Sequence, residues 1–144
     1  MSDTPTTTVA PTTGHSVLLV DDHDGNVRTF VDYLTAKGYH VVVARDGMEA
    51  IAHCEAWVPA IVLMDVQMPK LDGLAVTRRL RADPRFAAVP IIALTALAMP
   101  GDRERCLEAG MNEYFAKPVR LRAVLDMLVR LVGPAWQPAA PDPR

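Results

Sequence analysis

Cysteine is scarce in this chain of 144 residues. The chain also lacks a long apolar run and a large excess of charge of one sign. The two cysteines, Cys54 and Cys106, fall in different predicted helices without a CxxC partner, which argues against a disulfide framework or a zinc site. No apolar stretch reaches the roughly 18 residues that a membrane span requires. The net charge of −2 argues against a general attraction to nucleic acid or to an anionic membrane.

A secretory signal is also missing, because residues 2–13 are rich in Ser, Thr, Pro and Ala and lack the basic and then apolar order of a leader. We therefore expect a cytoplasmic protein. The composition at the two ends predicts disordered tails at 1–15 and 134–144 around one domain at 16–133. A hydrophobic content of 50% suffices for one core, and a second domain does not fit in this length.

Within the predicted domain, short apolar runs alternate with amphipathic stretches. Five βα units with short connections imply right-handed crossovers and a parallel sheet covered on both faces. The predicted fold is a doubly wound, flavodoxin-like α/β sandwich of three layers with strand order 2-1-3-4-5. The predicted strands are 16–20, 40–44, 60–64, 90–94 and 113–116, and the predicted helices are 25–37, 47–56, 73–82, 99–109 and 120–132.

Three acidic residues stand where two of these strands end. Asp21 and Asp22 close the run 17–20, and Asp65 closes the run 61–64. Strands 1 and 3 are neighbours in the predicted order, and open parallel sheets bind ligands beyond the carboxyl ends of their strands. Carboxylates gathered there repel one another unless a cation neutralises them, and Mg²⁺ prefers oxygen ligands. The pattern therefore predicts a magnesium site.

The other predicted strand ends add groups suited to phosphoryl transfer. Asp65 is placed to attack a phosphorus atom as a carboxylate nucleophile, and Mg²⁺ held by Asp22 and Asp65 would relieve the repulsion between the anions. Lys117 would bind a phosphoryl oxygen, and Thr95 would donate a hydrogen bond to another. Ala96 is small enough to leave the path of attack open. These residues predict self-phosphorylation on Asp65.

Five motifs in order carry a resemblance to a known family. They are Val20-Asp-Asp22, Met64-Asp-Val-Gln-Met-Pro69, Leu71-Asp-Gly73, Ala93-Leu-Thr-Ala96 and Lys117-Pro118. Together they resemble the receiver domain of two-component response regulators across about residues 16–132, because each motif stands at the predicted end of the appropriate strand. Local features, including the stretch 91–106, are similar to receivers of phosphorelays, hybrid kinases and single-domain cell-cycle regulators.

The resemblance implies a role for each residue of the site. Asp65 would be the phosphoacceptor, and Asp22 and Asp65 would ligate Mg²⁺ together with the backbone carbonyl of Gln67. Asp21 would act mainly through water, and Lys117 would bind the phosphoryl group. A cis peptide bond between Lys117 and Pro118 is expected from the same resemblance and would aim the lysine at the site.

The resemblance also implies a switch and partners. Thr95 and Tyr114 would form the switch pair, and inward movement of Thr95 would make room for the Tyr114 ring. The resulting change would be read on the surface of the fourth helix, fifth strand and fifth helix. We expect a sensor histidine kinase or phosphotransfer protein as donor, a target protein as reader, no nucleic acid and no membrane. The chain would be a monomer or a phosphorylation-linked dimer, a switch and not an enzyme, with only self-catalysed phosphorylation and autodephosphorylation.

Other interpretations remain open at this level. A flavodoxin-like cofactor binder would need a cradle of phosphate donors where residues 21–24 present anions. An aspartate-dependent phosphatase would have a second acid at position 67, which is Gln67. A phosphorylation-independent binding module is the third alternative. His23 departs from the acidic or Asn residue usual in this subfamily, and Pro100 enters the loop before the fourth helix.

Several charged residues are assigned structural roles. Asp72 is expected to cap the third helix, and Gly73 to fit a tight loop. The histidines at positions 15, 40 and 53 are assigned no function. The arginines at positions 78, 79, 81, 103 and 105 are interpreted as solvated helix faces, because the chain has neither a helix-turn-helix pattern nor a basic net charge.

Overall fold

The computed structural model describes residues 15–68, 71–96 and 100–133. The predicted tails therefore lie outside the described residues, apart from His15, as does the predicted start of the fourth helix at residue 99. In chain order the elements are β1 (Ser16–Val20), α1 (Asp24–Ala36), β2 (His40–Ala44), α2 (Gly47–Ala56), β3 (Ile61–Asp65), α3 (Gly73–Arg81), the short 3-10 helix η2 (Pro84–Phe86), β4 (Ile91–Thr95), α4 (Asp102–Ala109), β5 (Glu113–Ala116) and α5 (Leu121–Val132).

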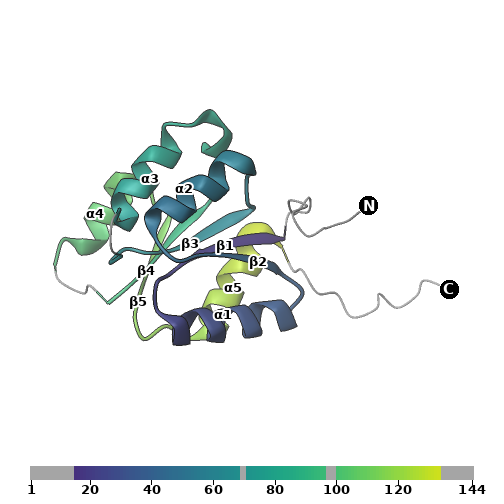
Figure 1. The fold of residues 1–144 in the computed structure, drawn as a ribbon. Helices are drawn as coiled ribbons and strands as arrows, with labels where there is room; N and C mark the ends of the chain where they lie inside the picture. Colours follow the sequence, from purple (N-terminus) through teal and green to yellow (C-terminus); the bar gives the residue numbers. More distant parts are fainter. Residues whose placement is uncertain (1–14, 69–70, 97–99, 134–144) are drawn as a thin grey trace, which may run out of the picture.

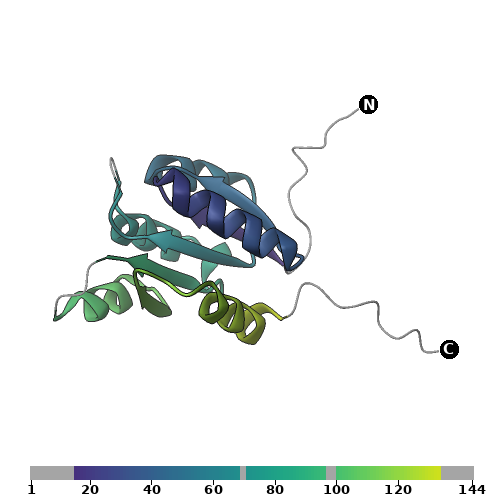
Figure 2. The same ribbon diagram turned by 90° about the horizontal axis from the view of Figure 1, so that it is seen from below.

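The strands form one parallel sheet in the order β2-β1-β3-β4-β5, which confirms the predicted topology. Helices α2, α3 and α4 cover one face of the sheet, and α1 and α5 cover the other (Figures 1 and 2). Strands β1, β3 and β4 are buried along their whole length, as expected for a parallel sheet covered on both sides.

Alternation along the strands divides the core into two layers. Leu18, Val62 and Ala93 point towards α2, α3 and α4, whereas Leu19, Leu63 and Leu94 point towards α1 and α5. The two layers fix the rotation of each strand, because a slip by one residue would exchange its two faces. The side chains at the strand ends therefore have defined directions.

Two strands end one residue later than the sequence predicted. Strand β4 begins at Ile91, because Pro90 has no backbone N–H to donate. Pro90 contributes only its carbonyl, which accepts a hydrogen bond from the Val62 N–H at 3.0 Å. Asp65 is paired with Leu94, and Thr95 with Ala116. Asp65 and Thr95 are thus the last residues of strands, held by the ladder, instead of the first residues of loops.

Arg81 corrects one expectation about the helix surfaces. Its guanidinium donates hydrogen bonds to the carbonyls of Phe86, Val89 and Gly110 and to the side-chain oxygen of Asn112, at 2.6–2.9 Å. The prediction of a solvated position is therefore wrong for this arginine, which ties the end of α3 to the loops before β4 and β5. The sequence alone did not show that three carbonyls converge at this point.

No helix in ranges 15–68, 71–96 and 100–133 combines the length and the apolar character needed to cross a membrane.

Candidate functional site

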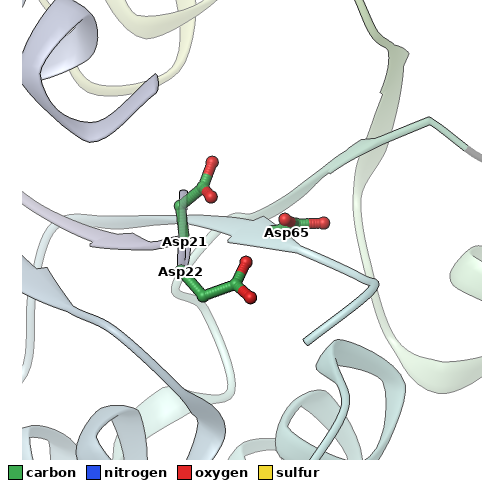
Figure 3. A group of neighbouring side chains, drawn as sticks. All are labelled: Asp21, Asp22 and Asp65. Atoms are coloured by element: carbon green, nitrogen blue, oxygen red, sulfur yellow. The ribbon is translucent and has the colours of Figure 1, made fainter. Parts of the chain in front are cut away.

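Three carboxylates meet at the carboxyl ends of β1 and β3. Asp21 and Asp22 follow β1, and Asp65 ends β3, the neighbouring strand (Figure 3). One carboxylate oxygen from each residue lies within 4.8 Å of the others. Asp21 and Asp65 are buried, whereas Asp22 is exposed to solvent. The juxtaposition predicted from the strand order is therefore present.

Backbone hydrogen bonds orient the two buried carboxylates. The N–H of His23 donates to Oδ1 of Asp21 at 2.9 Å, and the N–H of Gln67 donates to Oδ1 of Asp65 at 3.0 Å. Both are local bonds to the residue two positions on, which fold each loop back over its own aspartate. The Asp21 N–H in turn donates to the Ala44 carbonyl on β2 at 3.0 Å.

Lys117 bridges the two buried carboxylates. Its Nζ lies 3.2 Å from Oδ2 of Asp65 and 3.5 Å from Oδ2 of Asp21. The expected cis bond between Lys117 and Pro118 is present, and the Lys117 N–H donates to the Thr95 carbonyl at 2.8 Å. The site holds three carboxylates and one ammonium, so the cluster keeps a net negative charge that favours a divalent cation.

The environment of Asp65 shifts its acidity. Burial raises the pKa of the Asp65 carboxyl above its ordinary value, and the nearby charge of Asp21 acts in the same direction. Lys117 and the backbone N–H of Gln67 oppose this rise in pKa by stabilising the carboxylate. The anion of Asp65 therefore depends on neighbouring positive charge.

The predicted switch residues share one face of the sheet. Thr95 is fully buried at the end of β4, and Ala96 beside it is exposed. Tyr114 on β5 pairs with Ala93, two residues before Thr95, so the strand alternation places both side chains on the α2–α4 side. The Tyr114 ring is half-buried and packs against that layer of the core.

Two residues near the site act as helix caps. His23 is the N-cap of α1, and its Nδ1 accepts a hydrogen bond from the Asn26 N–H at 3.2 Å. Asp72 caps α3, as predicted, by accepting from the Ala75 N–H at 2.9 Å. The sequence marked His23 as a departure from the usual acidic or Asn residue but did not predict its capping role, because histidine is not among the preferred N-cap residues.

Comparison with known proteins agrees with this geometry. A model of the response regulator receiver domain matches residues 17–129. The chain belongs to this family. The polar-differentiation response regulator DivK of Brucella anthropi is 36% identical to this receiver over 120 residues, which cover 83% of this chain and 98% of that protein.

Solved structures extend the comparison to the fold. The receiver domain of the sensor histidine kinase PA1611 from Pseudomonas aeruginosa PAO1, which has a magnesium ion coordinated in its active site cleft, is 42% identical with a TM-score of 0.77. The match covers 83% of this chain and 98% of that one. The Vibrio cholerae chemotaxis protein CheY4 is 28% identical with a TM-score of 0.76, over 81% of this receiver and 97% of that chain. Receiver domains are regulatory modules of two-component signalling and not conventional enzymes.

Proposed function

We propose that this receiver accepts a phosphoryl group on Asp65 and thereby switches a protein-binding surface. The observation that carries the proposal is the Asp65 carboxylate at the end of β3, with Lys117 Nζ 3.2 Å away and the carboxylates of Asp21 and Asp22 beside it. Nucleophile, cation and metal-type ligands thus converge on one edge of a rigid sheet.

The donor set fits Mg²⁺. Asp22, Asp65 and the Gln67 carbonyl would hold the ion directly, and Asp21 through water. Hard oxygen ligands and an excess of negative charge are what this ion requires. When bound, Mg²⁺ supplies positive charge that lowers the repulsion between Asp65 and an incoming phosphoryl group.

The protein's own groups would carry out the transfer. A carboxylate oxygen of Asp65 would form a bond to phosphorus while the P–N bond of a donor phosphohistidine breaks. The electron pair of that bond would leave with the imidazole nitrogen, which would take up a proton from solvent. Lys117 would move its ammonium from the free carboxylate to a phosphoryl oxygen, which keeps the charge paired. Ala96 presents only a methyl group and leaves the approach open.

Thr95 would carry the signal from the phosphoryl group to the surface. A hydrogen bond from a hydroxyl to a charged group contributes about 1.5–3 kcal/mol, comparable to the free energy between two populated conformers. Movement of Thr95 changes the space beside Tyr114 on the same face of the sheet. The reader of that change would be a target protein at the α4–β5–α5 surface.

The donor would be a sensor histidine kinase or a phosphotransfer protein in the cytoplasm, and the same site would assist loss of the phosphoryl group to water. No nucleic acid or membrane takes part in this scheme. Phosphorylation would leave a monomer or form a dimer through the α4–β5–α5 surface.

The test is the intact mass after incubation with acetyl phosphate, with Mg²⁺, with EDTA, and with the Asp65→Asn variant. We expect a Mg²⁺-dependent gain of about 80 Da, the mass of one phosphoryl group on a carboxylate nucleophile, that is absent in the variant. Unchanged labelling of Asp65→Asn would move the acceptor elsewhere. No gain under any condition would favour a phosphorylation-independent binding module.

A further inference from the structure

Gly47, the first residue of α2, lies against the backbone of the segment that follows β3. A β-carbon at Gly47 would lie 2.2 Å from the Leu71 carbonyl oxygen, 2.7 Å from Leu71 Cβ and 2.9 Å from Val76 Cγ2. Contacts shorter than 3.0 Å are essentially never formed by real β-carbons. The close approach of α2 to this segment therefore requires glycine, although its backbone is in an ordinary helical conformation.

Hydrogen bonds and core packing fix the start of α2, so the helix has little freedom to move away from Leu71. Asp46 caps the helix by accepting from the Glu49 N–H at 2.8 Å, and Glu49 accepts from the Arg45 N–H at 2.8 Å. Ala50 and Cys54 bury the inner face of the helix in the core. The carbonyl of Ala44, three residues before Gly47, accepts a hydrogen bond from the Asp21 N–H. A β-carbon added at Gly47 would thus displace Leu71 and not α2.

The segment on the Leu71 side carries the proposed metal ligand Gln67 and ends at α3. At that end the Gly73 N–H donates to the Val66 carbonyl at 3.0 Å, and a β-carbon on Gly73 would lie 2.7 Å from the Asp65 carbonyl oxygen. The start of α3 is thus packed directly on the backbone of the phosphoacceptor. A displacement of Leu71 would thus reach the backbone of Asp65 and Val66 through Gly73, two residues further along the chain.

We propose that Gly47 is a positioning residue of the phosphorylation site, because its missing side chain lets α2 hold the segment after β3 in the geometry that presents the Gln67 carbonyl and the Asp65 carboxylate. Gly47 contacts neither metal nor phosphoryl group and acts through Leu71. The inference rests on the proposed function, since it concerns the same Mg²⁺ site.

The Gly47→Ala variant tests this role. The added methyl group forces the Leu71 carbonyl to move by about 1 Å to reach ordinary contact. We expect the Mg²⁺ dissociation constant to rise about tenfold, as when outer groups that orient metal ligands are changed. It is measured by titrating ¹⁵N-labelled protein with MgCl₂ and following the amide signals of Asp65 and Gln67. Urea unfolding in EDTA gives the stability of each variant.

Gly110→Ala is the matched control. A β-carbon there would lie 2.6 Å from Arg81 Cγ, and the φ of +114° also disfavours alanine, so this variant loses stability too. Gly110 precedes β5, at the edge of the sheet opposite to the carboxylates. We expect the control to bind Mg²⁺ as the wild type does. A purely structural role of Gly47 would make the two variants alike in affinity.

The outcomes separate this inference from the proposed function. A wild type whose Asp65 and Gln67 signals do not respond to MgCl₂ would overturn both. A responsive wild type with equal affinity in Gly47→Ala would overturn only the positioning role. If Gly47→Ala gives no folded spectrum, Leu71→Gly loosens the packing at this place without adding an atom, because it removes the Leu71 side chain, whose Cβ would lie 2.7 Å from a β-carbon at Gly47. Weaker Mg²⁺ binding by that variant supports the role, and unchanged binding overturns it.

Discussion

Removing the exposed charge of the acidic cluster should stabilise the protein when no metal is added. The three ligand oxygens lie within 4.8 Å of one another. Two like charges at that distance repel by about 1 kcal/mol in water and about 3 kcal/mol at an effective dielectric constant of about 20. Lys117 offsets part of this repulsion through its contacts with Asp21 and Asp65. Because Asp22 is exposed, we expect Asp22→Asn to raise the free energy of unfolding by about 1–2 kcal/mol.

Urea unfolding in EDTA and in MgCl₂ measures this effect. In EDTA the midpoint of Asp22→Asn should exceed that of the wild type by roughly 0.5–1 M. At a Mg²⁺ concentration ten times the dissociation constant, the wild type should gain about 1.4 kcal/mol, and the variant should gain little. Asp126→Asn, at an exposed aspartate on α5, is the control and should change neither value. A variant less stable than the wild type in EDTA would refute the reasoning from charge repulsion.

Three further predictions concern other parts of the chain. Arg81→Met should lower the free energy of unfolding, measured with urea, by about 3–5 kcal/mol, because three carbonyls lose a charged donor. The control Arg78→Met, at an exposed position, should change this free energy little. Burial raises the pKa of the Cys54 thiol to about 12 from an ordinary 9.0, so the folded state retains this proton while the unfolded state loses it above pH 9. Stability should therefore fall between pH 9 and 12, by about 1.4 kcal/mol at pH 10, and the fall should be smaller in Cys54→Ala when unfolding is measured against pH. Thr95→Ala should still gain phosphoryl mass, but the NMR signals of the Tyr114 ring should no longer shift on phosphorylation, and a shift as large as in the wild type would remove Thr95 from the switch.

The fold was predictable because its signals are periodic and local. Continuous apolar runs indicated buried parallel strands, and their alternation with amphipathic segments indicated right-handed crossovers. The strand order then brought Asp21, Asp22 and Asp65 to one edge, where the structure has them. The end of each strand was less predictable, because it depends on which backbone groups of the neighbouring strand remain to be paired, as for Asp65 and Thr95.

Contacts between distant segments could not be predicted from the sequence. Arg81 looks like any cation on an amphipathic helix until the fold brings the carbonyls of Phe86, Val89 and Gly110 around it. Gly47 likewise stands at an ordinary helix start, and only the approach of the Leu71 carbonyl shows why no side chain fits. In both cases backbone carbonyls are among the partners, and a pattern of side chains does not encode their positions.

The sheet has a stable apolar centre and an electrostatically unfavourable edge at the carboxyl ends of its strands. The central strands are fully buried and supply apolar burial along their whole length, whereas their carboxyl ends concentrate like charges that Lys117 neutralises only in part. Such an edge is tolerated because the ladder and the two core layers hold the carboxylates in place. Any ligand that brings compensating charge to Asp65 is then favoured in proportion to the repulsion it relieves. Mg²⁺ binding, as we propose it, would therefore change the free energy of the protein without a large movement of the fold, because the repulsion that it relieves is concentrated at the carboxyl ends of β1 and β3.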